Sequence, residues 1–501
     1  MPAQSGRRQL GVVAAGHQLS AEAGADALRA GGNAVDAALA ALLASFTCEP
    51  LLTGLGAGGY MLVVAPGETP VVLDFFVAAP GLGSDAGGPA ELLPVSISFG
   101  DAVQLFNIGP ASVATYGVPA GIAAASARFG RLPLAELTGP AAALARGGVA
   151  MTSQQAYLLQ LLGGLVKSTP ECAALFAPGG ELLSAGATTR QPELGDALEL
   201  LGAQGAEPFY RGEIGQAVVS WVRERGGMLS SDDLESYAVI DREPVRTAFR
   251  GRTILTNPPP SAGGILIAYA LSQLERGQAP ASTEAVVEAM AAAQSARTPE
   301  FIEGLNDPEF VRRFQGKTLG STTHVAVLDA GGMACSMTTS NGASSGVVVP
   351  GTGMHLNNML GESDLNPLGF HQHAAGARLP SMMAPTVVLS PDGGVPEIVV
   401  GSAGSNRIRS AILQTIVRVI DDGMHARTAV EAPRLHFEDG VIYTEPGIEL
   451  DELDLKRYGH APFHAPSLFF GGVQAVERDH DGWLWGGGDP RRGGAAIVVA
   501  A

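Results

Sequence analysis

A run of two threonines and a histidine, Thr322-Thr323-His324, carries the most informative candidate chemistry of this chain. If the peptide bond between Ser321 and Thr322 were cut, Thr322 would gain a free α-amine a few bonds from its own hydroxyl. An α-amine has a pKa of about 8, so at neutral pH a useful fraction of it can accept the hydroxyl proton. One residue would then be both nucleophile and base, with no separate His or Asp required.

The residues that follow predict a β-hairpin that begins at this threonine pair. Side chains alternate between two faces, with His324, Ala326 and Leu328 on one and Thr323, Val325 and Val327 on the other. The letters D-A-G-G at 329–332 turn the chain, and 333–340 form the return strand. An ordinary core strand is the alternative interpretation, because Thr and Val also suit a pleated surface for packing alone.

The return strand would bring a second hydroxyl back beside Thr322. Thr338, Thr339 and Ser340 all fall near its end. We expect Ser340 to be the residue that hydrogen-bonds the nucleophile oxygen.

A second candidate feature is a helix start in G-S-A-G-S-N-R-I at 401–408. Isoleucines recur at helical spacing from 408 to 420, so Gly404 and Ser405 are expected at a helix N-terminus. Free backbone N–H groups and the positive end of the helix dipole could stabilise a developing oxyanion there. A glycine-containing helix start that packing alone requires is the alternative.

An ordered series of sequence blocks over most of the chain resembles the γ-glutamyltranspeptidase family of N-terminal nucleophile hydrolases. The blocks are G-H-Q-L-S-A-E-A-G-A-D-A-L-R-A-G-G-N-A-V-D-A-A-L-A (16–40), E-P-L-L-T-G-L-G-A-G-G-Y-M-L-V (49–63), Y-G-V-P-A-G (116–121), N-P-P-P-S-A-G-G (257–264), the T-T-H tract, P-G-T-G-M-H-L-N-N (350–358), L-P-S-M-M-A-P-T (379–386) and G-S-A-G-S-N-R-I (401–408). Any single block would be weak, whereas the ordered series is specific.

The resemblance implies catalytic roles for residues already singled out. The family's nucleophile falls on Thr322, released by cleavage behind Ser321, and its assisting hydroxyl falls on Ser340, where the family usually has Thr. The family's double-glycine oxyanion hole falls on Gly404 and Ser405. Because backbone N–H groups hold the oxyanion, Ser in place of Gly need not abolish this function, and one such donor contributes about 3 kcal/mol to a transition state.

The substrate-binding positions depart from the family pattern. The family's L-D-F-R-E-x-A-P segment carries an Arg that binds the glutamyl α-carboxylate, but this chain reads L-D-F-F-V-A-A-P at 73–80, with Phe76 in the place of the Arg. Loss of a bidentate guanidinium removes a charge-assisted pair of hydrogen bonds. Either Arg378 or Arg407 supplies the missing charge, or the acyl donor is not a γ-glutamyl compound, which we favour.

Other positions of the donor site are implied by the same resemblance. The acidic residue that binds the donor amino group falls on Glu362, with Asp364 as an alternative. The family's paired serines fall on Ser381 and Met382, which weakens the carboxylate end further, and Asn341 is also placed among the substrate-binding residues.

Together these features predict an autoprocessed γ-glutamyltransferase-like enzyme that passes an acyl group from an amide to water or an amine, with glutathione-like donors as one class. The alternatives are an acylase for glutaryl-type or apolar amides and a non-catalytic binding relative. The predicted fold is α+β, a four-layer αββα sandwich. Segments 1–321 and 322–501 would be the large and small fragments, which stay associated in one unit.

Composition sets broader limits. The chain has 501 residues, 46% of them hydrophobic, and a formal charge of -18 with three lysines, which argues against nucleic acid or an anionic membrane as partner. Three distant cysteines give neither a disulfide framework nor zinc spacing, and no cofactor or metal is expected. Without an evident signal sequence or membrane span, we expect a cytoplasmic location.

Three motifs look catalytic but are expected not to be. G-x-G-x-x-G at 54–59 runs into a strand instead of the helix that a dinucleotide fingerprint needs, and G-x-S-x-G at 342–346 also lacks a following helix. His371 and His373 have no supporting acid or Cys, so a solvated loop is expected there. Among local signals, Asn33 is expected to cap a helix and T-A-V-E at 428–431 to form a capping box.

Overall fold

The computed structural model describes residues 8–83, 91–98, 103–296, 322–363, 365–366, 369–392 and 394–501. Ser321, the segment that precedes it and Asp364 therefore lie outside the described residues.

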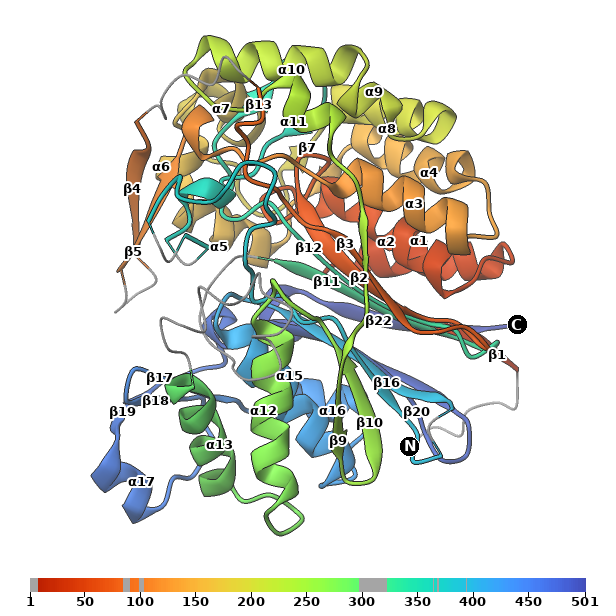
Figure 1. Cartoon of the computed structure of the whole chain (residues 1–501), viewed down its shortest axis with the longest axis vertical. Coiled ribbons are helices and arrows are strands. Elements are labelled where there is room, and N and C mark those ends of the chain that lie inside the picture. The colour runs from red at the N-terminus through yellow and green to blue at the C-terminus, as the bar shows by residue number, and fades with distance from the viewer. Residues whose placement is uncertain are drawn as a thin grey trace.

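One large sheet contains the predicted hairpin at its centre. Its seven described strands pair antiparallel throughout, in the order β22-β1-β11-β12-β2-β3-β8 (Figure 1). Their bounds are β1 Gln9–Ala15, β2 Gly58–Val64, β3 Val71–Phe75, β8 Ile240–Arg242, β11 Thr323–Asp329, β12 Ala334–Ser340 and β22 Ala495–Ala500. The hairpin prediction is thus confirmed, with the turn at 330–333.

A second antiparallel sheet lies against the first. Its order is β21-β20-β16-β15-β10-β9. The strands are β9 Val245–Phe249, β10 Arg252–Thr256, β15 Thr386–Leu389, β16 Pro396–Ala403, β20 Gly472–Arg478 and β21 Leu484–Gly488.

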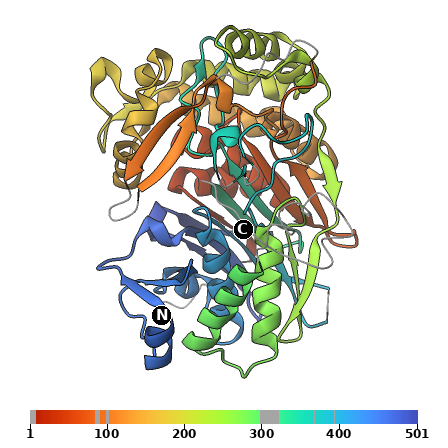
Figure 2. The ribbon, with the colours of Figure 1, turned by 60° about the vertical axis from the view of Figure 1, so that its left-hand side comes forward.

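Helices cover the outer face of each sheet, and Figure 2 shows the two helical layers at opposite ends of the molecule. The layer on the first sheet contains α1 Gln18–Arg29, α2 Ala34–Cys48, α3 Val118–Phe129, α4 Leu134–Gly147, α8 Pro192–Gln204, α9 Glu207–Tyr210, α10 Glu213–Glu224 and α11 Ser231–Glu235. The layer on the second sheet contains α12 Gly263–Glu275, α13 Thr283–Ser295, α15 Arg407–Ile420 and α16 Ala426–Glu431.

Smaller elements lie at the periphery. They are the β4 Leu93–Ser98 and β5 Val103–Ile108 hairpin, β6 Val149–Ala150 with β7 Thr188–Thr189, β13 Val348–Val349 with β14 Met354–His355, the three-stranded sheet of β17 Leu435–Glu438, β18 Val441–Thr444 and β19 Gly459–Pro462, and helices α5 Ser153–Leu161, α6 Gly163–Val166, α7 Pro170–Phe176 and α17 Glu452–Arg457. The described residues include no helix with the length and apolar character needed to cross a membrane.

Three apolar cores hold the layers together, as expected for the predicted four-layer αββα sandwich. Val325 and Val327 of β11 pack against the helices of the first outer layer, whereas Ala326 and Leu328 pack between the two sheets. The third core joins the second sheet to α12, α13 and α15. This division of β11 follows the alternation in the sequence, because successive side chains of a strand point to opposite faces.

Both sheets combine strands from before and after the predicted cut. In the first sheet β1, β2, β3 and β8 precede residue 321, whereas β11, β12 and β22 follow it. In the second sheet β9 and β10 come from the earlier segment. Fragments 1–321 and 322–501 would therefore remain joined by strand pairing and shared cores.

The local helix signals give one confirmation and one correction. The side chain of Asn33 accepts hydrogen bonds from the N–H groups of Val35 and Asp36, and a complete capping box starts α2. The predicted box at 428–431 is wrong, because α16 already begins at Ala426 and Thr428 lies inside it. The helix starts earlier because the Glu477 carboxylate from β20 accepts a hydrogen bond from the N–H of Ala426 at 2.7 Å.

Candidate active site

The register of the hairpin places Thr322 opposite Ser340. Thr323 pairs with Thr339 in the β11–β12 ladder, so the next position on each strand brings residues 322 and 340 together. Both line one small cavity between the sheets, near the point where β12 ends. Among the three hydroxyl residues considered from the sequence, only Ser340 reaches this cavity in the described structure, since Thr339 bonds Thr53 and Thr338 bonds His324.

The hydroxyl of Thr322 is buried and has no hydrogen-bond partner among the described residues. A buried hydroxyl without a partner costs about 1–3 kcal/mol. Other described hydroxyls, such as those of Ser20 and Thr115, share this feature, so the position of Thr322 opposite Ser340 is what distinguishes it. The hydroxyl of Ser340 accepts a hydrogen bond from the N–H of Gly342 at 2.8 Å, which fixes its oxygen beside the nucleophile position.

The segment between β16 and α15 contains Gly404 and Ser405, as predicted from the isoleucine spacing. Both residues lie in the left-handed region, with φ values of 112° for Gly404 and 66° for Ser405. No acceptor in the described part of the chain receives their N–H groups. Ile408, in the first turn of α15, lines the same cavity as Thr322. The loop therefore offers free backbone donors a few residues before Ile408, which lines the cavity at Thr322, and free N–H groups are what an oxyanion needs.

A chain of polar side chains supports this loop from β17. The Asn406 amide donates to the Glu438 carboxylate, and the other Glu438 oxygen lies 3.2 Å from Nε2 of His436. The Nδ1 atom of His436 lies 2.8 Å from the hydroxyl of Ser410 on α15. A non-glycine residue with positive φ, such as Ser405, persists only when its surroundings hold it, and this chain supplies part of that restraint.

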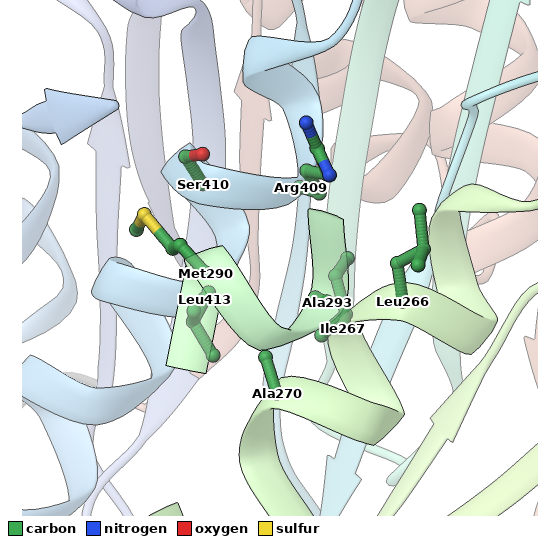
Figure 3. Close-up of a pocket in the computed structure, with 8 residues that line it drawn as sticks. All are labelled: Leu266, Ile267, Ala270, Met290, Ala293, Arg409, Ser410 and Leu413. Atoms are coloured by element: carbon green, nitrogen blue, oxygen red, sulfur yellow. The ribbon is translucent and has the colours of Figure 1, made fainter. Parts of the chain in front are cut away.

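The opposite side of α15 packs on α12 and α13. Figure 3 shows Arg409 and Ser410 at the edge of a small apolar pocket lined by side chains such as Leu266 and Met290. The guanidinium of Arg409 donates to the Oε1 atom of Gln294 on α13 at 2.6 Å. This pocket belongs to the packing of the helix that follows the oxyanion loop.

The cavity at Thr322 is largely apolar. Apart from the two hydroxyl residues 322 and 340 and Ser381, its described lining consists of Phe76, Met359, Leu365, Met382, Met383 and Ile408. The volume of about 10 Å³ corresponds to roughly one water molecule. No charged side chain lines the cavity among the described residues.

Phe76 occupies this cavity with firm support from its neighbours. Its side chain is fully buried, and its ring stacks on that of Tyr60 with centroids 5.3 Å apart. Ser381 and Met382, predicted to bind the substrate, also line the cavity, and the hydroxyl of Ser381 accepts a hydrogen bond from the N–H of Met383 at 3.1 Å.

The two basic residues considered as substitutes for the family's Arg are bound elsewhere. The Nε atom of Arg378 lies 3.3 Å from Asp74, and its guanidinium lies 4.4 Å from the ring centre of Tyr237. Arg407 donates from Nε to the carbonyl of Phe469 at 2.9 Å. Neither residue lines the cavity.

Two further predicted substrate residues lie next to the cavity without lining it. The Glu362 carboxylate accepts a hydrogen bond from the N–H of Ala343 at 2.8 Å, and the Asn341 amide donates to the carbonyl of His355 at 3.4 Å. Both contacts hold the turn that follows Ser340.

The two glycine motifs run into strands, as predicted, whereas the two histidines are less solvated than predicted. The glycine motif at 54–59 enters β2, and the motif at 342–346 is followed by β13 instead of a helix. His371 and His373 are half-buried, and each ring nitrogen lies about 3 Å from a backbone carbonyl oxygen, of Ala111 and Leu365 respectively. The described residues contain no cluster of three potential metal ligands.

The structure adds cavity residues that sequence reasoning missed, namely Met359, Leu365, Met383 and Ile408. Met359 and Leu365 flank the predicted Glu362, and Met383 follows the predicted Ser381-Met382 pair. Proximity to those motif positions was the available signal, but only the fold shows which side chains turn toward Thr322.

An αββα sandwich with a threonine at the start of a central strand, beside a second hydroxyl and a loop of free N–H groups, defines an N-terminal nucleophile hydrolase. Comparison with known families then identifies the particular group: the profile described as Gamma-glutamyltranspeptidase matches residues 20–319 and 309–499. The chain belongs to the gamma-glutamyltranspeptidase family, and the resemblance predicted from its motifs is confirmed. It is an N-terminal threonine amidohydrolase or acyltransferase.

Similar proteins fall into two groups within this family. The chain is 32% identical to the Acylase ACY 1 proenzyme of Pseudomonas sp. (strain SE83), over 98% of this chain and 94% of that protein. It is 31% identical to the Glutathione hydrolase proenzyme of Bacillus subtilis (strain 168), over 98% and 91%. The crystal structure of cephalosporin acylase from Bacillus halodurans superposes with a TM-score of 0.83 at 26% identity, covering 100% of this chain and 98% of the other.

Proposed function

We propose that this chain is a proenzyme that cuts its own Ser321–Thr322 bond and then uses Thr322 to cleave an amide with an uncharged, largely apolar acyl group. The names of both sequence relatives include the word proenzyme, which supports processing. The interleaved strands of both sheets support a mature enzyme whose fragments stay together.

The chemistry follows from the groups that line the site. The new α-amine of Thr322 accepts the proton of its own hydroxyl while the oxygen attacks the acyl carbon. The N–H groups of Gly404 and Ser405 stabilise the resulting oxyanion. The intermediate then collapses, the carbon–nitrogen bond breaks, and the amine leaves with the proton. Water or another amine then attacks the acyl ester, with the α-amine again accepting the proton. The oxygen of Thr322 leaves, takes up that proton and becomes the free hydroxyl again.

We choose the acyl group from the apolar lining of the cavity. A donor with a carboxylate on its acyl part would place a charge against Phe76, Met359 and Met382, with no guanidinium within the described lining. Burying an unpaired carboxylate is costly, whereas burial of apolar surface contributes about 25 cal/mol per Å². The apolar lining therefore favours an uncharged acyl chain over a γ-glutamyl or glutaryl group, although the cavity of about 10 Å³ must widen to admit either.

The names of the similar proteins support the use of acyl groups other than glutamyl within this family. One relative is named an acylase and the superposed crystal structure is titled a cephalosporin acylase, while the other relative is named a glutathione hydrolase. A γ-glutamyl donor is the second candidate for this chain, because Glu362 lies beside the turn after Ser340 and could move toward a donor ammonium group.

Processing is tested on a denaturing gel with mass spectrometry. Wild-type protein should give two fragments, the smaller of which begins at Thr322, while Thr322→Ala stays whole. Thr323→Ala is the matched control, because it removes the adjacent hydroxyl and leaves the proposed nucleophile. A mature protein that hydrolyses amides without a new terminus at residue 322 would contradict this proposal.

Acyl selectivity is tested with purified, processed enzyme and a panel of anilides. The panel contains γ-glutamyl, glutaryl, butyryl and hexanoyl p-nitroanilide. We expect the uncharged compounds to have kcat/KM values at least tenfold higher than either carboxylate-bearing compound. Best turnover of the γ-glutamyl compound would overturn the apolar assignment while leaving the nucleophile assignment intact.

A further inference from the structure

A second cleft reaches the start of β11 from the side opposite the acyl cavity. It lies between α5, the end of α2 and the turn at 490–492, and Glu49 and Arg492 both line it. Gln154, Gln155 and Tyr157 of α5 form the facing wall. The volume of about 60 Å³ leaves room for a few non-hydrogen groups.

Glu49 presents a buried carboxylate without a cationic partner. Its side chain accepts hydrogen bonds from the hydroxyl of Thr323, at 3.2 Å to each oxygen, and no ion pair forms with it in the described part of the chain. Burial raises the pKa of Glu49 to about 7, against the lowering effects of the Thr323 hydroxyl and the charge of Arg492. Arg492 thus acts on Glu49 through its charge without forming an ion pair with it.

Arg492 lies on another wall of the cleft and is a cation without a carboxylate partner among the described residues. One of its terminal nitrogens donates to the carbonyl of Leu468 at 3.2 Å, but its Nε atom is buried without a hydrogen-bond partner, and no described carboxylate pairs with it. The adjacent Arg491 differs, because it is held by Glu445 at 2.5 Å and Asp489 at 3.2 Å. Arg492 is therefore the guanidinium with free donors in this cleft.

We propose that the cleft binds a small zwitterion of the α-amino acid class, with its ammonium group against Glu49 and its carboxylate against Arg492. Partly buried charges are stable only when they are paired and hydrogen-bonded, and one such ligand would pair both at once. Arginine also suits a carboxylate geometrically, because its fork can donate two parallel hydrogen bonds. Binding here does not depend on which acyl group Thr322 accepts.

Isothermal titration of the full-length Thr322→Ala chain separates binding from turnover. L-alanine is compared with ethylamine, which lacks the carboxylate, and with propionate, which lacks the ammonium group. We expect L-alanine to bind at least tenfold more tightly than either analogue. Equal affinity for all three probes, or no binding at millimolar L-alanine, would overturn the proposal without any substitution in the cleft.

Two variants assign the ligand groups to the two side chains. Glu49→Gln should abolish the preference for L-alanine over propionate, and Arg492→Met should abolish the preference for L-alanine over ethylamine. Met382→Leu, a change in the acyl cavity, is the matched control and should leave L-alanine affinity unchanged. Loss of binding in Met382→Leu, with binding retained in both cleft variants, would place the ligand in the acyl cavity and overturn the proposal.

Discussion

The rings of Phe76 and Tyr60 lie stacked between the two sheets, with an angle of 21° between their planes. Phe76 is therefore part of the intersheet core as well as a wall of the cavity at Thr322. Arg378, one of the two basic residues considered as a substitute, is bound by Asp74 and Tyr237 outside the cavity. The packing between the two sheets therefore requires an apolar side chain at position 76.

Phe76→Arg should lower both stability and turnover of uncharged acyl anilides. An unpaired guanidinium in this core would cost about 3 kcal/mol or more of unfolding free energy, because Asp74 already pairs with Arg242 and Arg378. We expect kcat/KM for hexanoyl anilide to fall at least tenfold. Phe76→Leu, which stays apolar, should cost less than about 2 kcal/mol and retain the acyl preference. Unchanged selectivity in Phe76→Arg, measured on the same anilide panel, would contradict the role of this wall.

Ser340→Ala should slow both self-cleavage and amide hydrolysis. The substitution removes the hydroxyl opposite Thr322 and leaves the N–H of Gly342 without its 2.8 Å partner. Loss of one such interaction, about 1.4–2.7 kcal/mol, corresponds to a tenfold to hundredfold decrease in rate. Ser340→Thr keeps a hydroxyl and should retain most of the rate. The time course of fragment formation on a gel and kcat of the processed enzyme measure the two effects, and wild-type rates in Ser340→Ala would exclude an assisting role.

The sequence sufficed for the parts of the site that local patterns determine. Alternation along β11 showed which face His324 and Ala326 occupy, and the isoleucine spacing placed Gly404 and Ser405 before a helix. Register then followed from the short turn, which made Ser340 the partner of Thr322.

Tertiary packing decides the rest, and the sequence could not show it. Arg378 is close to the substrate motif in the chain, but Asp74 from another strand holds its guanidinium away from the cavity. Glu49 ends a helix that is buried throughout, so nothing in its local pattern marks a contact with Thr323. The capping box at 428–431 failed because Glu477, almost fifty residues later, supports an earlier helix start.

Asn406→Ala should lower kcat with little change in KM. The Asn406 amide ties the oxyanion loop to Glu438, so its loss should loosen Gly404 and Ser405 without touching the acyl wall. Because removal of a whole oxyanion donor costs a factor of about 10²–10³, partial misplacement should cost roughly tenfold.

Gln414→Ala is the matched control for this prediction. Gln414 also joins α15 to β17, through hydrogen bonds of 2.8 and 3.0 Å to Leu435, but it lies two turns beyond the loop. Its loss should lower the melting temperature and leave kcat unchanged. A similar fall in kcat for both variants would show that helix stability, and not loop position, sets the rate.

The free energy of unfolding should decrease in acid because several histidines are buried in neutral form. Burial lowers the pKa of His324 to about 3, from about 6.5 for an exposed histidine, while its ring nitrogen lies 2.8 Å from the hydroxyl of Thr338. Between these two values the unfolded chain binds the proton and the folded chain does not, so stability falls as pH decreases from about 6.5 toward 3. Burial also lowers the pKa values of His355 and His436, each to about 4, with the same sign.

Comparing wild type with His324→Gln isolates the contribution of this residue. Glu49 acts in the opposite direction, because its pKa of about 7 lies above that of an exposed carboxyl, and stability associated with it is lost as pH rises. Because wild type and variant both contain Glu49 and the other histidines, the contributions of those residues to the pH dependence cancel in the difference between the two proteins. Between pH 7 and pH 5, urea unfolding should show wild type losing about 2 kcal/mol more than the variant. An unchanged slope in His324→Gln would mean that the intersheet histidine accepts a proton without unfolding.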